Sequence, residues 1–474
     1  MLCSGVRLTL LGAARQVTGS CYALETSGAG NTGGSRFFVD CGLYQERALQ
    51  SRNWEPTPFD VGALHAVVLT HAHLDHSGLL PKLVREGFRG PIYTTPPTAE
   101  LIRIVLEDSA RLQREDVDTK KKRHRKEERK SPHPYRPLYT LDDVKRTLRQ
   151  VRMLEYGEPV RIGSDVSVVL RDAGHILGSA IVEIEVDAGP RLVFSGDLGQ
   201  PEVPLVRNPT PLQHADYVII ESTYGARDHE HNTKIEDQLA EAVNTAADAG
   251  GNLVIPTFAI DRAQQLLLHL GNLLHAGRIP QLRVFLDSPM AIRVTEIYMR
   301  NLEYLDDATR EALTQGHLAE DWSWLELSRT RAQSMKINGL PGTKVVLAGS
   351  GMCTGGRIKH HLAWNLGRPE SILLFAGYQA EGTLGRLLLE GARSVRLFGR
   401  EHDVRASVRQ IQGLSAHAGR DDLLGWLGGL EAPPRRVIVS HGSESAALAL
   451  AERVRSDFGY EVEVPRYREP LELG

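Results

Sequence analysis

The sequence contains few cysteines, no long apolar run and no large excess of charge of either sign. Its four cysteines, Cys3, Cys21, Cys41 and Cys353, lie far apart without a C-x-x-C pair, which excludes a thiolate zinc site and a disulfide-rich fold. No stretch of about 20 apolar residues is present, so we expect no membrane span. The net charge of −3 gives no general attraction for nucleic acid, so a polyanion site must be local. We expect a cytoplasmic protein.

The most informative stretch is a cluster of four metal-binding side chains, His71, His73, Asp75 and His76, within six residues. It follows the apolar run 66–70, which predicts a buried strand, and precedes residues 77–83, which open a helix. Turns at strand ends are common sites of chemistry in α/β proteins. Imidazole and carboxylate groups are ligands that zinc favours. The cluster has too many ligands for one tetrahedral ion, so other parts of the chain must supply partners.

Further polar side chains follow other predicted strands, and they complete two ligand sets. His71, His73 and His175 can hold one ion. Asp75, His76 and His441 can hold a second ion, and Asp197 can bridge the two. Zinc–nitrogen bonds of roughly 2.0–2.1 Å and a metal separation of about 3.5–4 Å are expected for such a centre. Two ions so placed lower the pKa of a bound water and stabilise charge at an attacked phosphoryl group.

The order of predicted elements indicates one domain inserted into another. The chain opens with closely spaced strands, which predict an antiparallel meander. After Tyr224, strands and helices alternate at the spacing of a doubly wound parallel sheet. Strand-end histidines return at His417 and His441. We therefore predict a first domain at 1–223 that closes at 409–474, with an inserted α/β domain at 224–408.

These motifs resemble the metallo-β-lactamase fold hydrolases. Asp40 matches the first motif of that family, His71-x-His73-x-Asp75-His76 matches the second, and His175 and Asp197 match the third and fourth. Glu221, His417 and His441 resemble three added motifs of the β-CASP branch, whose members cleave nucleic acids. The resemblance implies an α/β protein, an αββα sandwich with an inserted parallel-sheet β-CASP domain. The chain is similar to the group of β-CASP proteins that includes the endonuclease subunit of the mRNA 3′-end cleavage and polyadenylation factor.

The resemblance implies a zinc-dependent ribonuclease with two Zn²⁺ per chain, acting on single-stranded RNA through a metal-activated hydroxide. His417 has no place in the ligand sets, so we assign it as general acid, with Glu221 keeping it charged and Asp40 orienting the metal site. A structural Glu–His pair is the alternative for Glu221 and His417. The glycine-rich turn 349–357 can present Ser350, Gly351, Thr354 and Arg357 to RNA phosphates, although a plain turn is nearly as good an interpretation.

Several alternatives stay open at this point. A DNA-processing β-CASP nuclease, a small-molecule metallohydrolase and an inactive scaffold subunit are competing functions, and a homodimer is one possible assembly. The sequence does not separate endonuclease from 5′-exonuclease action, or zinc from manganese. Residues 119–130 contain eight Lys or Arg against two Glu. This run is either a solvated helix face or loop, or a contact for the RNA backbone. Asp261 stands where relatives often have glycine.

Overall fold

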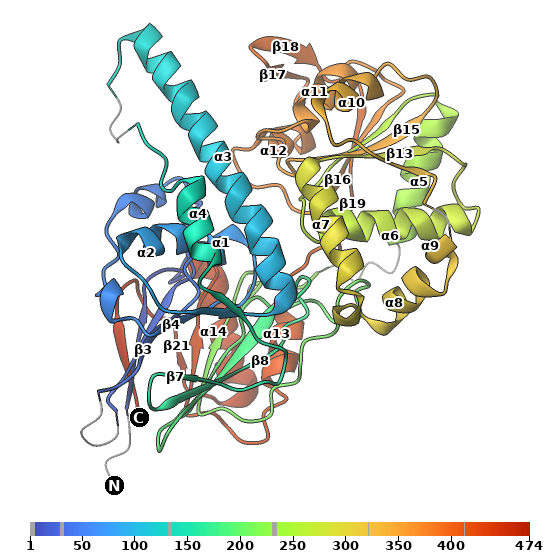
Figure 1. Ribbon diagram of the computed structural model, residues 1–474. Coiled ribbons are helices and arrows are strands. Elements are labelled where there is room, and N and C mark those ends of the chain that lie inside the picture. The colour runs from blue at the N-terminus through green and yellow to red at the C-terminus, as the bar shows by residue number, and fades with distance from the viewer. Residues whose placement is uncertain (1–4, 29–32, 131–134, 230–234, 321, 412) are drawn as a thin grey trace. The chain divides into compact units, whose positions relative to one another are not determined.

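The structure is a computed structural model that describes residues 5–28, 33–130, 135–229, 235–320, 322–411 and 413–474 (Figure 1). The chain forms two compact units. The first unit comprises 1–202, 208–228 and 417–474, and the second comprises 203–207 and 229–416. The second unit is therefore inserted into the sequence of the first. None of the described helices combines the length and apolar composition that a membrane crossing needs.

The first unit contains two seven-stranded sheets. One has the order β22–β1–β2–β3–β4–β5–β6 and the other β21–β20–β11–β10–β9–β8–β7. The strands of the first sheet are β1 Val6–Leu10, β2 Tyr22–Thr26, β3 Arg36–Val39, β4 Ala66–Val68, β5 Ile92–Thr94, β6 Val151–Met153 and β22 Pro470–Leu473. Those of the second are β7 Val160–Ile162, β8 Val166–Asp172, β9 Ala180–Val186, β10 Arg191–Phe194, β11 Tyr217–Ile220, β20 Arg436–Val439 and β21 Val462–Glu463.

Apolar side chains from both sheets meet in one core. In β8 the alternate residues Val166, Val168 and Leu170 are fully buried and pack with Leu8 and Phe37 of the first sheet. This period of two places one face of each strand in the core. The helices of this unit are η1 Gln50–Trp54, η2 Val61–Ala63, α1 Leu74–Ser77, α2 Leu80–Glu86, α3 Pro96–Glu127, α4 Leu141–Leu148, α13 Arg420–Leu427 and α14 Glu444–Phe458.

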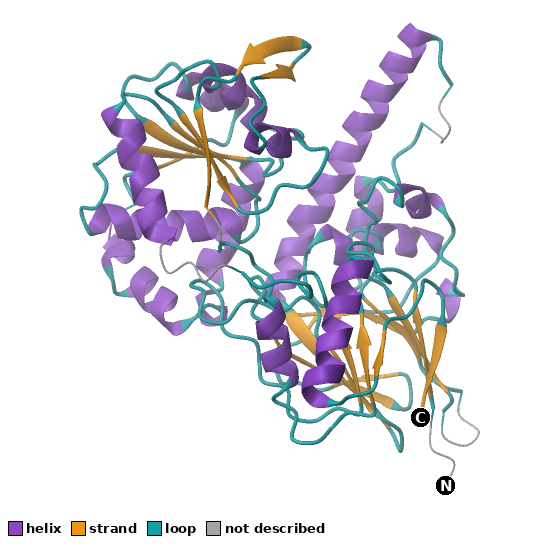
Figure 2. Cartoon of the chain, turned by 180° about the vertical axis from the view of Figure 1, so that it is seen from behind, coloured by secondary structure: helices purple, strands orange, loops and turns teal. Residues whose placement is uncertain are grey.

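Helices cover the outer faces of the two sheets. In α14, Ala447, Leu450, Ala451 and Val454 follow the spacing of one helix face, and they pack against apolar residues of β11 and β20. On the other side, α4 contacts α2 and α3, and α3 contacts β6. The layers can be followed in Figure 2. The predicted αββα sandwich is confirmed.

The second unit has a six-stranded, fully parallel sheet of order β14–β13–β15–β12–β16–β19. Its strands are β12 Leu253–Pro256, β13 Arg283–Asp287, β14 Leu325–Leu327, β15 Lys344–Ala348, β16 Ile372–Ala376 and β19 Ser407–Ile411, beside a hairpin of β17 Ser394–Leu397 and β18 Arg400–Asp403. Its helices are α5 Ile235–Asp248, α6 Arg262–His275, α7 Pro289–Arg300, η3 Leu302–Tyr304, α8 Asp307–Thr314, α9 His317–Glu320, α10 Arg331–Ile337, α11 Ile358–Asn365 and α12 Leu384–Leu389.

The two faces of this parallel sheet are both buried. Alternate strand residues such as Val254 and Phe375 pack with α11 and α12, whereas Ile255 and Leu374 pack with α5 and α6. Burial on both faces is typical of parallel sheets and accounts for the nearly continuous apolar runs of these strands. The predicted inserted parallel-sheet domain is thus confirmed.

The sequence pattern predicts helices over 98–113 and 141–154, and the observed elements differ from both predictions. The helix expected over 98–113 continues to Glu127, so the basic run lies mainly on α3. The helix expected over 141–154 ends at Leu148, and Val151–Met153 instead forms an edge strand against β5. Edge pairing depends on a partner distant in sequence, which local pattern does not reveal.

Candidate metal centre

The strand register of the first unit determines why the predicted ligands converge. β3 and β4 pair in parallel, as do β10 with β11 and β11 with β20. Parallel strands in register end at the same edge of a sheet. Asp40, Asp197, Glu221 and His441 each follow one of these strands, and the histidine turn follows β4. These side chains therefore meet at one edge of the sandwich.

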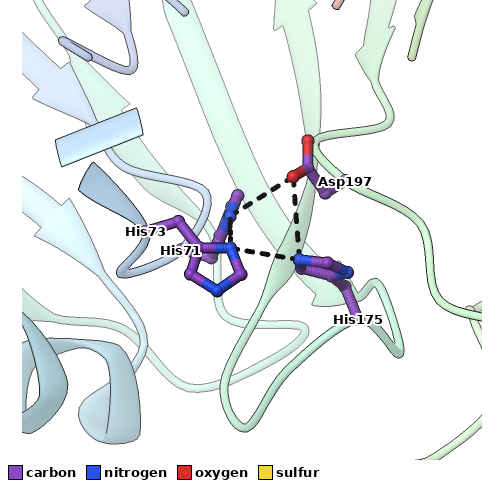
Figure 3. A group of neighbouring side chains, drawn as sticks. All are labelled: His71, His73, His175 and Asp197. Carbon is purple, nitrogen blue, oxygen red and sulfur yellow. Dashed lines mark hydrogen bonds and ion pairs between the residues drawn. The ribbon is translucent and has the colours of Figure 1, made fainter. Parts of the chain in front are cut away.

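The first donor set consists of His71, His73, His175 and Asp197 (Figure 3). His73 Nδ1 lies 3.0 Å from His71 Nε2 and 3.2 Å from His175 Nε2. Asp197 Oδ2 lies 3.5 Å from His71 Nε2 and 3.6 Å from His175 Nε2. A tetrahedral zinc with bonds of about 2.0 Å requires ligand atoms about 3.3 Å apart. These four separations are close to those expected of a tetrahedral metal shell.

The second donor set consists of Asp75, His76 and His441. It meets the other oxygen of Asp197, because Oδ1 lies 3.2 Å from His76 Nε2 and 3.3 Å from His441 Nε2. Asp197 therefore presents one oxygen to each set. Burial alone would raise the pKa of this carboxyl, but His441, His76 and His71 lower it well below its usual range. Both oxygens carry charge and suit a bridging ligand.

Two features indicate that these sets fit metal ions. Asp197 Oδ1 and His441 Nε2 are buried, and neither has a hydrogen-bond partner among the described residues. Buried polar atoms without partners are costly, and a metal ion would satisfy both. Burial also lowers the pKa of His71 and His73, which favours the neutral imidazole that binds metal.

Asp40 orients His76 by contacting the ring nitrogen that faces away from Asp197. Its carboxylate accepts hydrogen bonds from the backbone N–H of Thr70 at 2.8 Å and from the Thr70 hydroxyl, and it contacts His76 Nδ1 at 2.7 Å. This contact leaves His76 Nε2 facing Asp197. Gly42 allows the Asp40 loop to approach α1, because a Cβ there would lie 1.6 Å from the backbone oxygen of Asp75.

Ser20 supports His441 in the same manner, and sequence reasoning missed it. The Ser20 hydroxyl lies 2.9 Å from His441 Nδ1, so Nε2 of that ring faces Asp197. The His441 backbone adopts φ 46°, and its N–H donates to the carbonyl of Ala13. The loop between β1 and β2 thus positions a candidate ligand more than 400 residues away. A serine in a loop carries no sequence signal for this role.

His417 and Glu221 lie beside Asp197, and the three side chains form a third cluster of carboxylate and imidazole groups. His417 Nδ1 is 3.1 Å from Glu221 Oε1 and 3.9 Å from Asp197 Oδ2, and its side chain is 21% exposed. Burial alone lowers the pKa of His417, but the carboxylates of Glu221 and Asp197 outweigh burial and raise it to about 10. Glu221 is itself fixed by the backbone N–H of Leu198 at 2.7 Å. The two carboxylates therefore favour the charged imidazolium form of His417, and the ring keeps some access to solvent.

The predicted phosphate-binding residues lie in the second unit, after β15. The Ser350 hydroxyl accepts a hydrogen bond from the Gly355 N–H at 3.2 Å and lies 3.3 Å from the Thr354 hydroxyl. Gly351 packs against the ring of Phe258. Arg357 donates to Asp287 at 2.7 Å and to the carbonyl of Ser328, so its guanidinium is engaged inside the domain. A role in substrate binding for these four residues stays a prediction.

Comparison with protein-family models assigns three consecutive regions. Residues 35–257 match a beta-lactamase superfamily domain, residues 263–388 match a Beta-Casp domain, and residues 401–465 match a Zn-dependent metallo-hydrolase RNA specificity domain. The three matches follow the order of the first unit, the inserted unit and the closing segment. The candidate metal ligands lie in the first and third of these regions.

Similar proteins span nearly the whole chain. A protein named Ribonuclease TTHA0252 from Thermus thermophilus is 40% identical over 98% of this chain and 99% of its own length. The Transcription termination factor FttA of Methanosarcina mazei is 33% identical over 95% of this chain and 69% of its own length. A crystal structure of an Enterococcus faecalis protein of unknown function, 12% identical, covers 99% of this chain and 100% of its own with a TM-score of 0.54, which supports the fold alone. The chain belongs to the β-CASP family, whose members are metal-dependent hydrolases with the metallo-β-lactamase fold.

Proposed function

We propose that this chain is a zinc-dependent ribonuclease that hydrolyses phosphodiester bonds of single-stranded RNA with two zinc ions. The observation that carries the proposal is the position of Asp197, whose two oxygens face two separate ligand sets beside a charged imidazole. The relatives named as a ribonuclease and as transcription termination factors support an RNA substrate. The matched RNA specificity domain supports it as well.

His71, His73, His175 and Asp197 would hold one ion, and Asp75, His76, His441 and Asp197 the other. When bound, such a pair supplies an activated water and a positive field for the phosphoryl oxygens. The protein orients both shells through Asp40 and Ser20, which contact the ring nitrogens turned away from the metals.

His417 supplies the proton that the leaving group needs. Attack of water on phosphorus breaks the bond to the 3′-oxygen, which is too basic to leave unprotonated. With Nδ1 held by Glu221, we propose that His417 delivers its proton through Nε2. The products are a 5′-phosphate and a 3′-hydroxyl, and His417 regains its proton from solvent. Its pKa of about 10 keeps the imidazolium charged at neutral pH.

The buried, unpaired cysteines Cys21, Cys41 and Cys353 support a reducing compartment, and we propose that the protein acts in the cytoplasm.

A cleavage assay tests the proposed substrate and the mode of attack. Purified protein with zinc is incubated with one single-stranded RNA labelled at either end, with a circular RNA and with DNA of the same sequence. Cutting of the circle establishes endonuclease action, and release of 5′-labelled mononucleotide establishes 5′-exonuclease action. Elemental analysis should find two metals per active chain. Cleavage of DNA alone, or activity with one metal, contradicts the proposal.

A second assay tests the role of His417. His417→Ala should lose about 10²–10⁴-fold in kcat on RNA. On bis(p-nitrophenyl) phosphate the loss should be small, because nitrophenolate leaves without protonation. His214→Ala is a matched control, since His214 forms an exposed pair with Glu431 at 3.4 Å in the same unit. Equal losses on both substrates would refute the general-acid assignment.

A further inference from the structure

The second half of α3 carries a positive cluster that the proposed chemistry does not use. Residues 120–126, here called the basic arm, read Lys-Lys-Lys-Arg-His-Arg-Lys, so six of seven are Lys or Arg. All six are exposed. The buried residues of α3 extend only from Pro97 to Ala110, and Figure 1 shows the far end of the helix projecting beyond α4.

The structure gives these six charges no internal role. Among the described residues, no acidic group lies within ion-pair distance of any of them; the nearby pair Arg129–Glu127 lies outside the arm. Cations favour the last turn of a helix, but the dipole effect fades within that turn. Because α3 ends at Glu127, Lys120 to Arg123 lie before its last turn. Stabilisation of the helix end therefore does not account for the cluster.

The charge balance of the chain points to a polyanion. The whole sequence has a net charge of −3, and without the six charges of the arm the remainder would have −9, or −5 with the two proposed Zn²⁺ bound. A protein with this remainder repels a phosphate backbone at long range. A local cluster of Lys and Arg that form no ion pairs counters this repulsion and binds phosphates without regard to sequence.

The arm is connected to the metal centre through one continuous helix. Thr95, the N-cap of α3, donates to the carbonyl of Gly178 at 2.6 Å, and Thr98 donates to the same carbonyl at 2.8 Å. Gly178 lies three residues after the metal-site residue His175. From Thr95 to Lys120 the helix rises about 1.5 Å per residue, or roughly 37 Å. The arm therefore lies at a fixed distance along α3 from the loop of the metal centre.

We propose that the basic arm is a phosphate-binding site for the part of an RNA strand that extends away from the metal centre. This inference rests on the proposed ribonuclease function. A stacked strand that rises about 3.4 Å per nucleotide needs on the order of eleven nucleotides to span from the centre to the arm. The arm thus adds affinity for long RNA and none for short RNA, and it is indifferent to base sequence.

The test removes four charges from the arm and compares two substrate lengths. The arm variant is K120Q/K121Q/K122Q/R123Q; Gln and Lys have similar helix propensity, so α3 should remain folded by circular dichroism. With RNA of about thirty nucleotides, KM at about 0.1 M salt should rise on the order of tenfold, whereas KM for RNA of about six nucleotides should not change. The slope of log kcat/KM against log salt for long RNA should weaken by about three.

The matched control removes four exposed positive charges elsewhere in the same unit that, among the described residues, also form no ion pair, as R85Q/R149Q/R152Q/R466Q. It has the same net charge as the arm variant and should keep the wild-type length dependence. If the arm variant and the control raise KM for long RNA equally, the effect is general charge and the arm proposal is overturned. Equal KM values for wild type and the arm variant on long RNA also overturn it.

A binding measurement separates this proposal from the ribonuclease proposal. Fluorescence anisotropy of labelled RNA is recorded on the full chain with a chelator present, so that the result does not depend on cleavage. Weaker binding of long RNA by the arm variant than by the control supports the arm even if the wild-type protein cleaves no RNA. In that case the ribonuclease proposal is refuted, whereas the proposal that the arm binds RNA is supported. Equal binding by both variants refutes the arm even if cleavage is observed.

Discussion

Replacing Asp261 by asparagine should stabilise the second unit above pH 7 and leave its stability near pH 4 almost unchanged. Asp261 lies between β12 and α6, is 2% exposed, and has no hydrogen-bond partner for either carboxylate oxygen among the described residues. Burial raises the pKa of this carboxyl to about 7, against a partly opposing effect of Arg262. Its backbone, at φ 66° and ψ −64°, forms a tight turn in which the Arg262 N–H donates to the carbonyl of Ile260.

The magnitude follows from the shift between the folded and unfolded pKa. The unfolded value is 3.8 and the folded value about 7. Between these values the folded state holds a proton that the unfolded state has lost, so stability falls as pH rises. At 1.36 kcal/mol per pH unit the total loss is roughly 4 kcal/mol, of which about 2 kcal/mol falls between pH 5 and 7 and about 3 kcal/mol between pH 5 and 8. Above about pH 8 the loss is complete. Asparagine, which does not ionise, removes this dependence.

The assay is chemical unfolding of the full chain at about pH 5 and about pH 8, a range that brackets most of the titration. Tryptophan fluorescence can be confined to the second unit in a W54F/W426F background, because the remaining residues, Trp322, Trp324 and Trp364, all lie there. The wild-type free energy of unfolding should fall between the two pH values by about 3 kcal/mol more than that of Asp261→Asn. Parallel pH dependence, or an asparagine variant less stable at pH 8, would show that Arg262 keeps the carboxylate charged and would refute the reasoning.

Three further predictions concern the metal centre. Ser20→Ala should weaken metal binding about 10–100-fold, because His441 loses the contact that orients it. Competition with a zinc-sensitive dye measures the affinity, and an unchanged affinity would argue against a role for Ser20 in orienting His441. Asp197→Asn should retain fewer than two metals per chain after dialysis, whereas retention of both would exclude a bridging role. Glu221→Gln should lower the pKa of His417, so activity on RNA should decline at a lower alkaline pH than in wild type. An alkaline limb that does not move would contradict the proposed pairing.

The fold class and the meeting of the candidate ligands at one place could be predicted, because the sequence signals for both are local and dense. Three histidines and an aspartate within six residues predict a metal site by themselves, and the change from closely spaced strands to alternating strands and helices marks the insertion. The full length of α3 could not be predicted, because its second half has no apolar period and folds through helix-forming Lys, Arg and Glu.

Contacts between residues far apart in sequence also escaped prediction. The pairing of β1 with β22 joins segments more than 450 residues apart, and Ser20 acts on His441 across a similar distance. The sequences of β1 and β22 do not identify each other as partners, and the sequence around Ser20 does not point to His441. Asp261 is a different case: the sequence shows a departure from glycine, but only the structure shows a buried carboxyl without a partner.

The order of the ligands along the chain has a consequence for biosynthesis. His71, His73, Asp75, His76, His175 and Asp197 are translated before the second unit, whereas His417 and His441 are translated after it. A nascent chain that has not been translated past the second unit therefore lacks both the proposed proton donor and the last candidate ligand of the second set. Translation takes place beside a messenger RNA, and on the proposed function the chain becomes competent to cut RNA only after its second unit has been made. The late position of these two histidines delays activity without a separate inhibitor.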